Sequence, residues 1–279
     1  MTRDDILKQI HVNMPFHMLI REYLPLVVSA GINPEIGFKG DDLDGFTRDD
    51  FADVARRLRD VGTRITFHAP FMDLRPGAID ERVRRVTLDR LRQVFNMAPL
   101  FSPSRIVCHA SFDARYYWSQ EEAWLEKSRR TWCECLSWAR DAETRIVLEN
   151  VYEDSPVMFE KLLSLLPTDA PVGLCFDTGH FNVFSRVPLD EWIDAVGSSI
   201  EHVHLHDNDG TMDAHAPVGE GTFPFDQLFA LLEKGGITPT VTLEPHSEEA
   251  LWRTIDNLSS MKWFDSFLAR RDMMTSSVF

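Results

Sequence analysis

Three short clusters of histidine and acidic residues lie between positions 177 and 215 of the chain. They read Asp177-Thr178-Gly179-His180, His202-Val203-His204-Leu205-His206-Asp207 and Asp213-Ala214-His215. Further residues of these types end apolar β-type runs elsewhere, at His68, His109, Glu149 and Glu244. Imidazole and carboxylate are ligands that divalent zinc, manganese and iron accept. The sequence therefore predicts a metalloenzyme, and the number of ions it holds decides its chemistry.

Repeated βα units are expected to position these groups, because short apolar runs alternate with longer helical patterns. The expected strands are 10–14, 35–38, 64–68, 105–109, 145–150, 172–177, 200–206 and 240–244. Helical periodicity covers 49–61, 81–98, 121–142, 188–196, 225–233 and 248–260, with start signals at Thr47, Ser155-Pro156 and Ser247. We expect an α/β fold, a single (β/α)8 TIM barrel over residues 1–263, followed by a C-terminal extension over 264–279.

The candidate ligands stand where such barrels build their active sites, at the C-terminal ends of the strands. This position is shared by His68, His109, Glu149, Asp177, His204 and Glu244. For a single strand-end histidine, a hydrogen-bonded core residue is the simpler interpretation, but His68 and His109 occupy equivalent points of neighbouring strands. Buried polar groups without partners are costly, so convergent ones need ions, substrate or one another.

The remaining candidates lie around the seventh strand and the loop after it. The histidines at 202, 204 and 206 share one strand face. We expect His204 to be the ligand, with His206 and Asp207 contacting ligands or substrate. Asp213-Ala214-His215 is either a metal-binding segment or a surface turn. Gly219 and Gly221 flank Glu220, and this loop could bring backbone amides and Glu220 to a substrate.

Composition limits the partners. The chain has 279 residues, 44% hydrophobic, with 29 Lys and Arg against 44 Asp and Glu, a formal charge of −15. Such a surface repels nucleic acid and anionic membranes. The four cysteines do not form a disulfide pattern, and no signal or membrane segment is evident. We expect a cytoplasmic protein that acts on a small molecule; an oligomer remains open.

The motifs resemble those of the xylose isomerase-like TIM barrel superfamily, also described as AP endonuclease family 2. The resemblance is carried by His68-Ala69-Pro70, Cys108-His109, Leu148-Glu149-Asn150, Asp177-Thr178-Gly179-His180, His204-Leu205-His206-Asp207, Asp213-Ala214-His215 and Thr242-Leu243-Glu244-Pro245. It runs in order from about residue 11 to 260. The superfamily includes endonuclease IV-type phosphodiesterases and many sugar isomerases and epimerases.

The resemblance implies two alternative metal centres. In the isomerase branch one ion would take Glu149, Asp177, His204 and Glu244. The endonuclease IV-like branch would use the same set as one site of a trinuclear zinc centre. There His68, His109 and Glu149 would hold another ion, and His180, Asp213 and His215 a third.

The leading hypothesis is a divalent-metal phosphoester hydrolase holding two or three Zn²⁺ ions, with Mn²⁺ or Fe²⁺ as alternatives. Its substrate would be a small phosphodiester rather than DNA, because the chain is acidic and the segment 71–77 lacks a DNA-penetrating loop. That segment is similar to cobamide-remodelling phosphodiesterases, which cleave the nucleotide loop of corrinoids. The alternatives are a sugar or sugar-phosphate isomerase or epimerase with Glu149 and Glu244 as its acid–base pair, and a non-catalytic metal-binding barrel.

Overall fold

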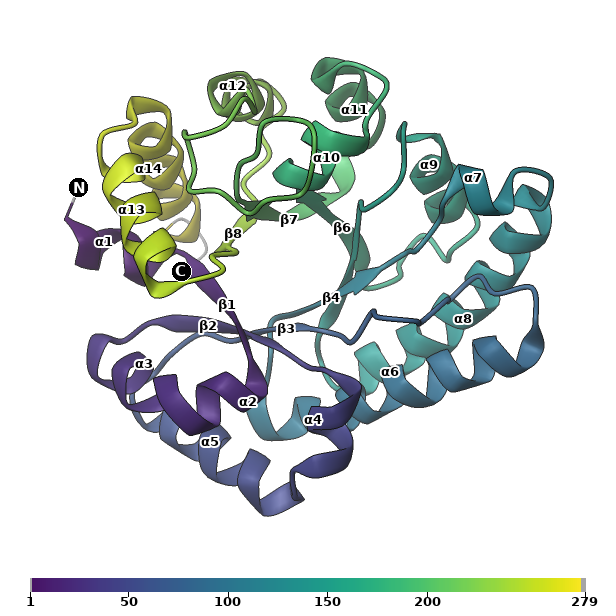
Figure 1. The fold of residues 1–279 in the computed structure, drawn as a ribbon, viewed down its shortest axis with the longest axis horizontal. Coiled ribbons are helices and arrows are strands. Elements are labelled where there is room, and N and C mark those ends of the chain that lie inside the picture. The colour runs from purple at the N-terminus through teal and green to yellow at the C-terminus, as the bar shows by residue number, and fades with distance from the viewer. Residues whose placement is uncertain (1, 277–279) are drawn as a thin grey trace.

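Eight parallel strands close into a barrel in the order β1-β2-β3-β4-β5-β6-β7-β8. The structure is a computed structural model that describes residues 2–276. The strands are β1 His11–Pro15, β2 Asn33–Gly37, β3 Thr66–His68, β4 Arg105–His109, β5 Arg145–Glu149, β6 Val172–Asp177, β7 Ile200–Leu205 and β8 Thr240–Leu243. Figure 1 shows these strands at the centre with helices around them. The (β/α)8 prediction is confirmed.

Helices cover the outside of the barrel and pack an extensive apolar core against it. They are α1 Arg3–Gln9, α2 Phe16–Met18, η1 Leu19–Tyr23, α3 Leu24–Ala30, α4 Gly40–Gly45, α5 Arg48–Asp60, α6 Glu81–Phe101, α7 Ala114–Tyr117, α8 Glu121–Asp141, α9 Val157–Ser164, α10 Thr178–Phe184, α11 Leu189–Val196, η2 Gly197–Ser199, α12 Phe225–Lys234, α13 Glu248–Ser259 and α14 Lys262–Ser276. None of the helices within residues 2–276 has the length and apolarity needed to cross a membrane.

Local sequence signals explain where several helices begin. Thr47 caps α5 and Ser247 caps α13, each accepting a hydrogen bond from a backbone N–H of the first turn, as predicted. The prediction for α9 is wrong in detail. Pro156 occupies the cap position and contributes no side-chain hydrogen bond, so Ser155 does not cap this helix.

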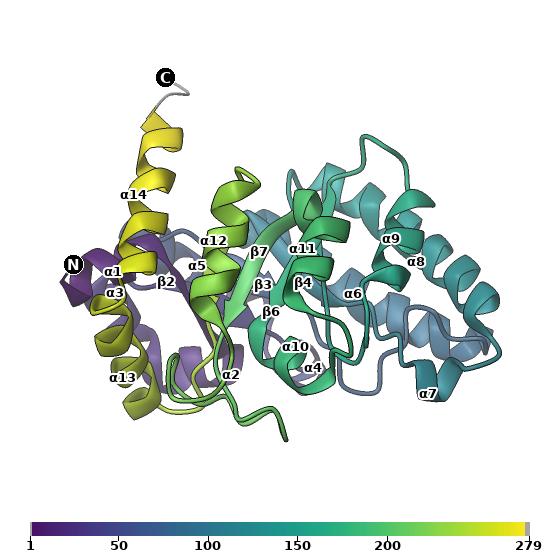
Figure 2. The same ribbon diagram turned by 90° about the horizontal axis from the view of Figure 1, so that it is seen from above.

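The expected C-terminal extension begins inside the core. Phe264, Phe267 and Leu268 of α14 are buried among core residues, and α14 packs beside α12. Figure 2 shows α14 at the upper left beside α12, and α7 at the lower right. Residues 277–279 of the expected extension lie outside the described residues.

Strand register brings the candidate ligands to one rim. His109 pairs with Glu149 across β4 and β5, and Asp177 pairs with His204 across β6 and β7. His68 ends β3, and Glu244 follows directly after β8. In a parallel barrel these positions share one end, so side chains from distant parts of the chain meet there.

Candidate metal centre

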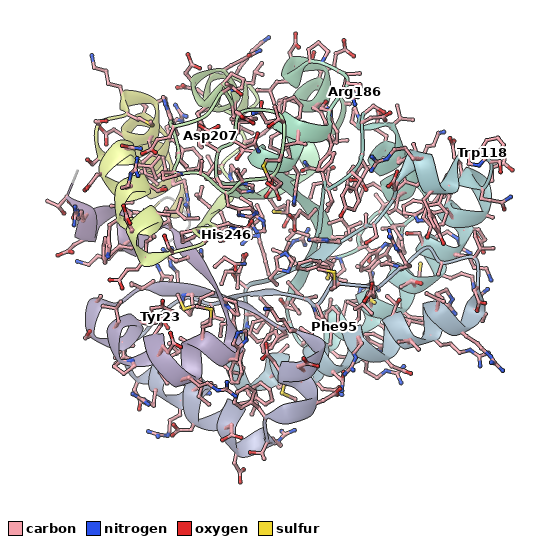
Figure 3. The ribbon with its side chains drawn as sticks, viewed as in Figure 1. Tyr23, Phe95, Trp118, Arg186, Asp207 and His246 are labelled. Carbon is pink, nitrogen blue, oxygen red and sulfur yellow. The ribbon has the colours of Figure 1, made fainter. Side chains whose placement is uncertain are left out.

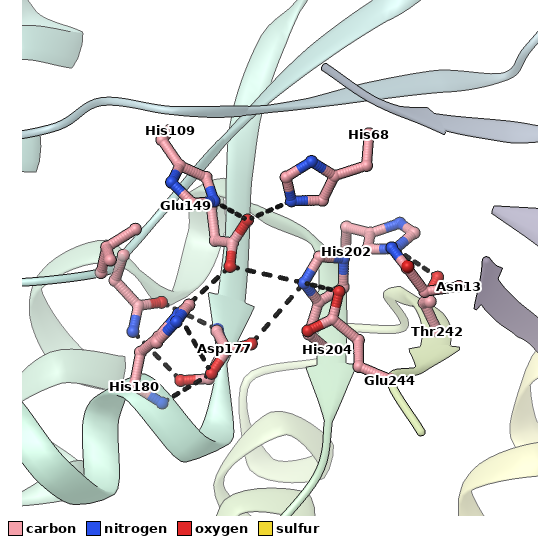
Figure 4. A network of polar contacts seen from close by, with 12 residues as sticks. Asn13, His68, His109, Glu149, Asp177, His180, His202, His204, Thr242 and Glu244 are labelled. Atoms are coloured by element: carbon pink, nitrogen blue, oxygen red, sulfur yellow. Dashed lines mark hydrogen bonds and ion pairs between the residues drawn. The ribbon is translucent and has the colours of Figure 1, made fainter. Parts of the chain in front are cut away.

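The Glu149 carboxylate lies at the middle of the cluster and faces four imidazoles (Figure 4). Its Oε2 is 3.1 Å from Nε2 of His68 and 3.2 Å from Nε2 of His109. Its Oε1 is 3.1 Å from Nδ1 of His180 and 3.5 Å from Nδ1 of His204. One carboxylate in this position can be shared between two ions.

Asp177 connects this group to the start of α10. As the N-cap of that helix, it accepts a hydrogen bond of 2.6 Å from the backbone N–H of His180. Its Oδ2 lies 3.0 Å from Nε2 of His206 and 3.6 Å from Nδ1 of His204. Glycine is needed at position 179, because a Cβ there would lie 2.0 Å from Cε1 of His206.

Asp213 and His215 complete the cluster at the mouth of the barrel. Oδ2 of Asp213 lies 3.3 Å from Nε2 of His180 and 3.2 Å from Nε2 of His215. The ring of His215 stacks on His206 at 3.8 Å. Its backbone adopts a left-handed conformation, φ 47°, which is uncommon outside glycine and often marks functional positions. The pair is therefore part of the cluster and not a detached surface turn.

Hydrogen bonds fix the orientation of several imidazoles. Nδ1 of His68 lies 2.9 Å from the carbonyl oxygen of Ala69, and Nδ1 of His215 lies 3.1 Å from the carbonyl oxygen of Glu244. Because a carbonyl only accepts, Nδ1 must carry the proton in both rings. In the metal-free protein Nε2 also donates a proton, to Glu149 from His68 and to Asp213 from His215. A bound ion would replace that proton and take the Nε2 lone pair.

Unpartnered atoms at the centre also fit bound cations. Nδ1 of His204 makes no hydrogen bond to any described residue, although carboxylate oxygens of Glu244, Glu149 and Asp177 lie 3.3, 3.5 and 3.6 Å away. Nδ1 of His180 and Oδ1 of Asp213 are buried and equally unpartnered. Ligand atoms within 4.8 Å of one another form the groups His68–His109–Glu149, Glu149–Asp177–His204, His68–His204–Glu244 and His206–Asp213–His215. The donor set thus suits more than one divalent ion.

The electrostatics of the cluster rest on mutual compensation between acids and imidazoles. Burial opposes charge on Glu149, but His109 and His204 outweigh it and hold the pKa of this carboxyl well below its usual range. Burial likewise opposes charge on His215, but Asp213 and Glu244 raise its pKa to about 9. Asp177 and Asp213 raise the pKa of His180 well above its usual value in the same way.

Glu35 lies beneath the cluster and was not identified from the sequence. It is fully buried; Oε1 lies 3.0 Å from Nε2 of His204, and Oε2 lies 3.1 Å from Nε2 of His202. Thr66 and Thr242 donate hydrogen bonds to Oε2, and Asn13 donates one to Oε1. An acidic residue in the middle of a short buried strand was the signal that could have revealed it.

The expected substrate contacts of Asp207 and Glu220 are not supported, because both carboxylates are engaged elsewhere. Asp207 accepts hydrogen bonds from the backbone N–H groups of Gly219, Gly221 and Phe223 at 3.0, 2.9 and 3.1 Å. Gly221 approaches the backbone of this same segment, not a ligand. Glu220 is exposed and pairs with Arg253 of α13. Neither is among the described residues that line the cavity above the cluster.

That cavity has a volume of about 520 Å³ and opens at the barrel mouth. Seven candidate ligands contribute to its wall: His68, His109, Glu149, His180, Asp213, His215 and Glu244. Asp177, His204 and His206 lie deeper. Phe71 stacks on His109 at 4.3 Å and covers one side. Among the described residues of the wall, Lys39 is the one lysine or arginine.

Comparison with known proteins agrees with this architecture. Residues 32–266 match the family model described as xylose isomerase-like TIM barrel. An uncharacterised protein of Methanocaldococcus jannaschii is 30% identical over 194 residues, which span 67% of this chain and 66% of that relative, just under two thirds of its length.

Solved structures share the fold at low sequence identity. A D-tagatose 3-epimerase-like protein superposes with a TM-score of 0.77 at 21% identity, covering 94% of this chain and 99% of that one. A Thermus thermophilus protein from crystals soaked with ZnCl2 gives a TM-score of 0.73 at 26% identity, covering 89% and 97%. An L-ribulose 3-epimerase gives 0.72 at 14% identity, covering 96% and 98%.

Proposed function

Because the chain belongs to the xylose isomerase-like TIM barrel family, we propose that it is a metal-dependent enzyme, and that it hydrolyses a small phosphodiester. The observation that carries this proposal is the convergence of Asp213, His215 and His180 with the group around Glu149. A one-ion isomerase centre needs Glu149, Asp177, His204 and Glu244 alone. The further ligands have a role if the centre holds two or three ions.

The charge of the cluster supports the same conclusion. Four carboxylates contribute to it, from Glu149, Asp177, Asp213 and Glu244, and ionised they carry a formal charge of −4 against neutral imidazoles. One divalent ion would leave −2, two would leave zero, and three would leave +2. Buried charge without compensation is costly, so a single ion requires protonated imidazoles such as His180 and His215 beside it, whereas two ions leave every imidazole free to ligate. A site at zero or +2 accepts the anionic phosphodiester.

The side chains have distinct tasks in this proposal. When bound, divalent ions supply charge stabilisation to a phosphoryl group and lower the pKa of water. Glu149 holds the middle of the centre, with His68 and His109 on one of its oxygens. Asp213 and His215 hold the mouth, where the ester enters. Hydrolysis adds water across one P–O bond and gives a phosphomonoester and an alcohol.

The proposal is tested with protein stripped of metal and reloaded with Zn²⁺, Mn²⁺ or Fe²⁺, and with bis(p-nitrophenyl) phosphate as the probe. We expect release of p-nitrophenol that is lost in Asp213→Ala. The matched control is Asp209→Ala, because Asp209 is exposed in the same loop and bonds only locally, to Thr211. No turnover with any of the three metals, or equal rates in the two variants, would contradict the proposal.

Sugar epimerisation is the second candidate, and the solved epimerase structures of the same fold favour it. Glu149 and Glu244 both border His204 and could remove and return a proton beside a carbonyl that an ion polarises. The test is deuterium uptake from solvent into D-fructose and D-tagatose. Uptake that disappears in Glu244→Gln, together with one ion per chain, would favour this candidate over hydrolysis.

A further inference from the structure

The cavity above the metal centre extends sideways into an apolar crevice. We call this the β1 crevice and define it by Val12 and Met14 of β1, Met18 of α2, Leu26 and Val27 of α3, and Leu251 of α13. α3 and α13 lie on the two sides of β1 in Figure 1. Figure 3 shows Tyr23, another wall residue, over the α3 side and His246 nearer the middle of the barrel.

Strand alternation explains why this part of the wall is apolar. Side chains along a strand point alternately to its two faces. Asn13 points into the barrel, where it bonds Glu35, so Val12 and Met14 point outward to the helices. The stretch from Val12 to Pro15 covers three residue steps, or about 10 Å. The crevice therefore descends along the outer face of β1 and is not a part of the barrel interior.

The crevice belongs to the same cavity as the candidate ligands. Glu244 and His246 line it beside the cluster, and Leu251 follows on α13. The segment between α2 and α3 is a π-helix, Leu19–Tyr23. Such turns are rare and frequently occur at functional sites. This π-helix separates Met18 from α3 in the crevice wall. Because the crevice and the candidate ligands line one cavity, a ligand held at the metal centre has direct access to the crevice.

We propose that the substrate carries an apolar alkyl or aryl group close to the reacting ester, and that this group fills the β1 crevice. Apolar surface is released from water when such a group enters, which favours binding. The hydroxyls of a free sugar would lose hydrogen bonds to water against this wall. The reacting end of this substrate rests on the proposed hydrolase function; occupation of the crevice does not depend on turnover.

Binding is measured first, without catalysis. Methylphosphonate and octylphosphonate are titrated by calorimetry into the zinc-loaded protein. We expect octylphosphonate to bind tighter by on the order of a thousandfold or more, since each of its roughly seven additional carbons contributes about a threefold to fourfold gain when buried. Leu26→Trp fills the crevice and should remove the difference between the two ligands. Ser29→Trp is the matched control, because Ser29 lies on the same helix but is exposed. It should keep the difference.

Turnover is measured next, with methyl, butyl and octyl p-nitrophenyl phosphate. In the wild type kcat/KM should rise with chain length, mainly through KM, and Leu26→Trp should flatten that rise, whereas Ser29→Trp should keep it. Equal affinities of the two phosphonates, or no binding of octylphosphonate, would overturn the crevice proposal even if every ester is hydrolysed. Preferential binding of octylphosphonate without any hydrolysis would uphold the crevice and refute the hydrolase.

Discussion

The Glu35 carboxylate lies 3.0 Å from Nε2 of His204, on the side of the imidazole that faces away from the candidate metal centre. The contact is an ion pair without hydrogen-bond geometry, and its negative charge beside Nε2 favours the proton of His204 there and leaves Nδ1 for an ion. Both groups are fully buried, so little else can compete for them. A carboxylate behind a ligating histidine orients the ring and raises its basicity.

Replacing Glu35 should therefore weaken metal binding without touching a ligand. We predict that Glu35→Gln lowers zinc affinity about 10- to 100-fold, the range typical of such outer partners. Competition with a chromophoric chelator measures this affinity. Glu220→Gln is the control, because Glu220 is exposed and lies outside the centre. Unchanged affinity in Glu35→Gln would show that its contact with His204 has no such role.

Glu149 and Asp213 should separate the two enzymatic candidates. Glu149→Gln is expected to abolish activity in either case, since its carboxylate faces four imidazoles of the centre. Asp213→Ala should damage a multinuclear hydrolase far more than a one-ion isomerase. Initial rates on phosphodiester and ketose substrates, with ion content determined for each variant, distinguish these outcomes. Wild-type activity retained in both variants would be inconsistent with both assignments.

Metal binding should release protons. The pKa of His215 is raised to about 9 by Asp213 and Glu244 against the effect of burial, so this ring is protonated at pH 7 before metal binds. Ions require the neutral ring, and apparent zinc affinity should rise with pH up to about 9. Calorimetry in buffers of different ionisation enthalpy counts the protons released. A binding heat independent of the buffer would contradict this.

The raised pKa of His215 should make the metal-free protein less stable as pH rises, whereas zinc affinity rises with pH. A folded-state pKa of about 9, above the unfolded value of about 6.5, stabilises the fold fully below the unfolded pKa. That contribution disappears as pH rises through the folded pKa. Urea unfolding of the metal-free protein should therefore show falling stability between about pH 6.5 and 9, less steeply in His215→Gln.

We predict that Asp207 stabilises the loop after β7 and does not bind metal or substrate. Its carboxylate accepts hydrogen bonds from four backbone N–H groups of the loop after β7, those of Asn208, Gly219, Gly221 and Phe223. Asp207→Ala would leave these donors without their acceptor. We expect a loss of stability on the order of 3 kcal/mol, from urea unfolding. The number of bound ions in the folded variant should stay unchanged. Loss of an ion at full stability would instead restore the expected role in the site.

The barrel and most of its rim could be predicted because they follow from local patterns. Alternating apolar runs define the strands, and a parallel barrel brings the strand ends carrying His109, Glu149 and Asp177 to one place whatever the loops do. Glu35 was missed because its partners His204 and Thr242 come from distant strands. Asp207 was placed at the site from its nearness in sequence to His204, but such nearness does not fix the direction in which a side chain points, and its carboxylate bonds the loop after β7.

The six predicted helices are present, but the spacing between helices and the contacts of the loops could not be predicted, for a related reason. The β1 crevice arises from the spacing of α3 and α13 around β1, and that spacing depends on packing between segments more than 200 residues apart in the sequence. No pattern within either helix encodes it. The position of Glu220 could not be predicted either, because its ion pair with Arg253 depends on where α13 packs against the loop after β7.

The most direct test of the account is an anomalous-diffraction count of ions in crystals of the zinc-loaded protein. The account predicts two or three zinc sites that share Glu149, with His68 and His109 on one side and Asp213 with His215 at another. A single ion held by Glu149, Asp177, His204 and Glu244, with His109, Asp213 and His215 free of metal, would contradict it.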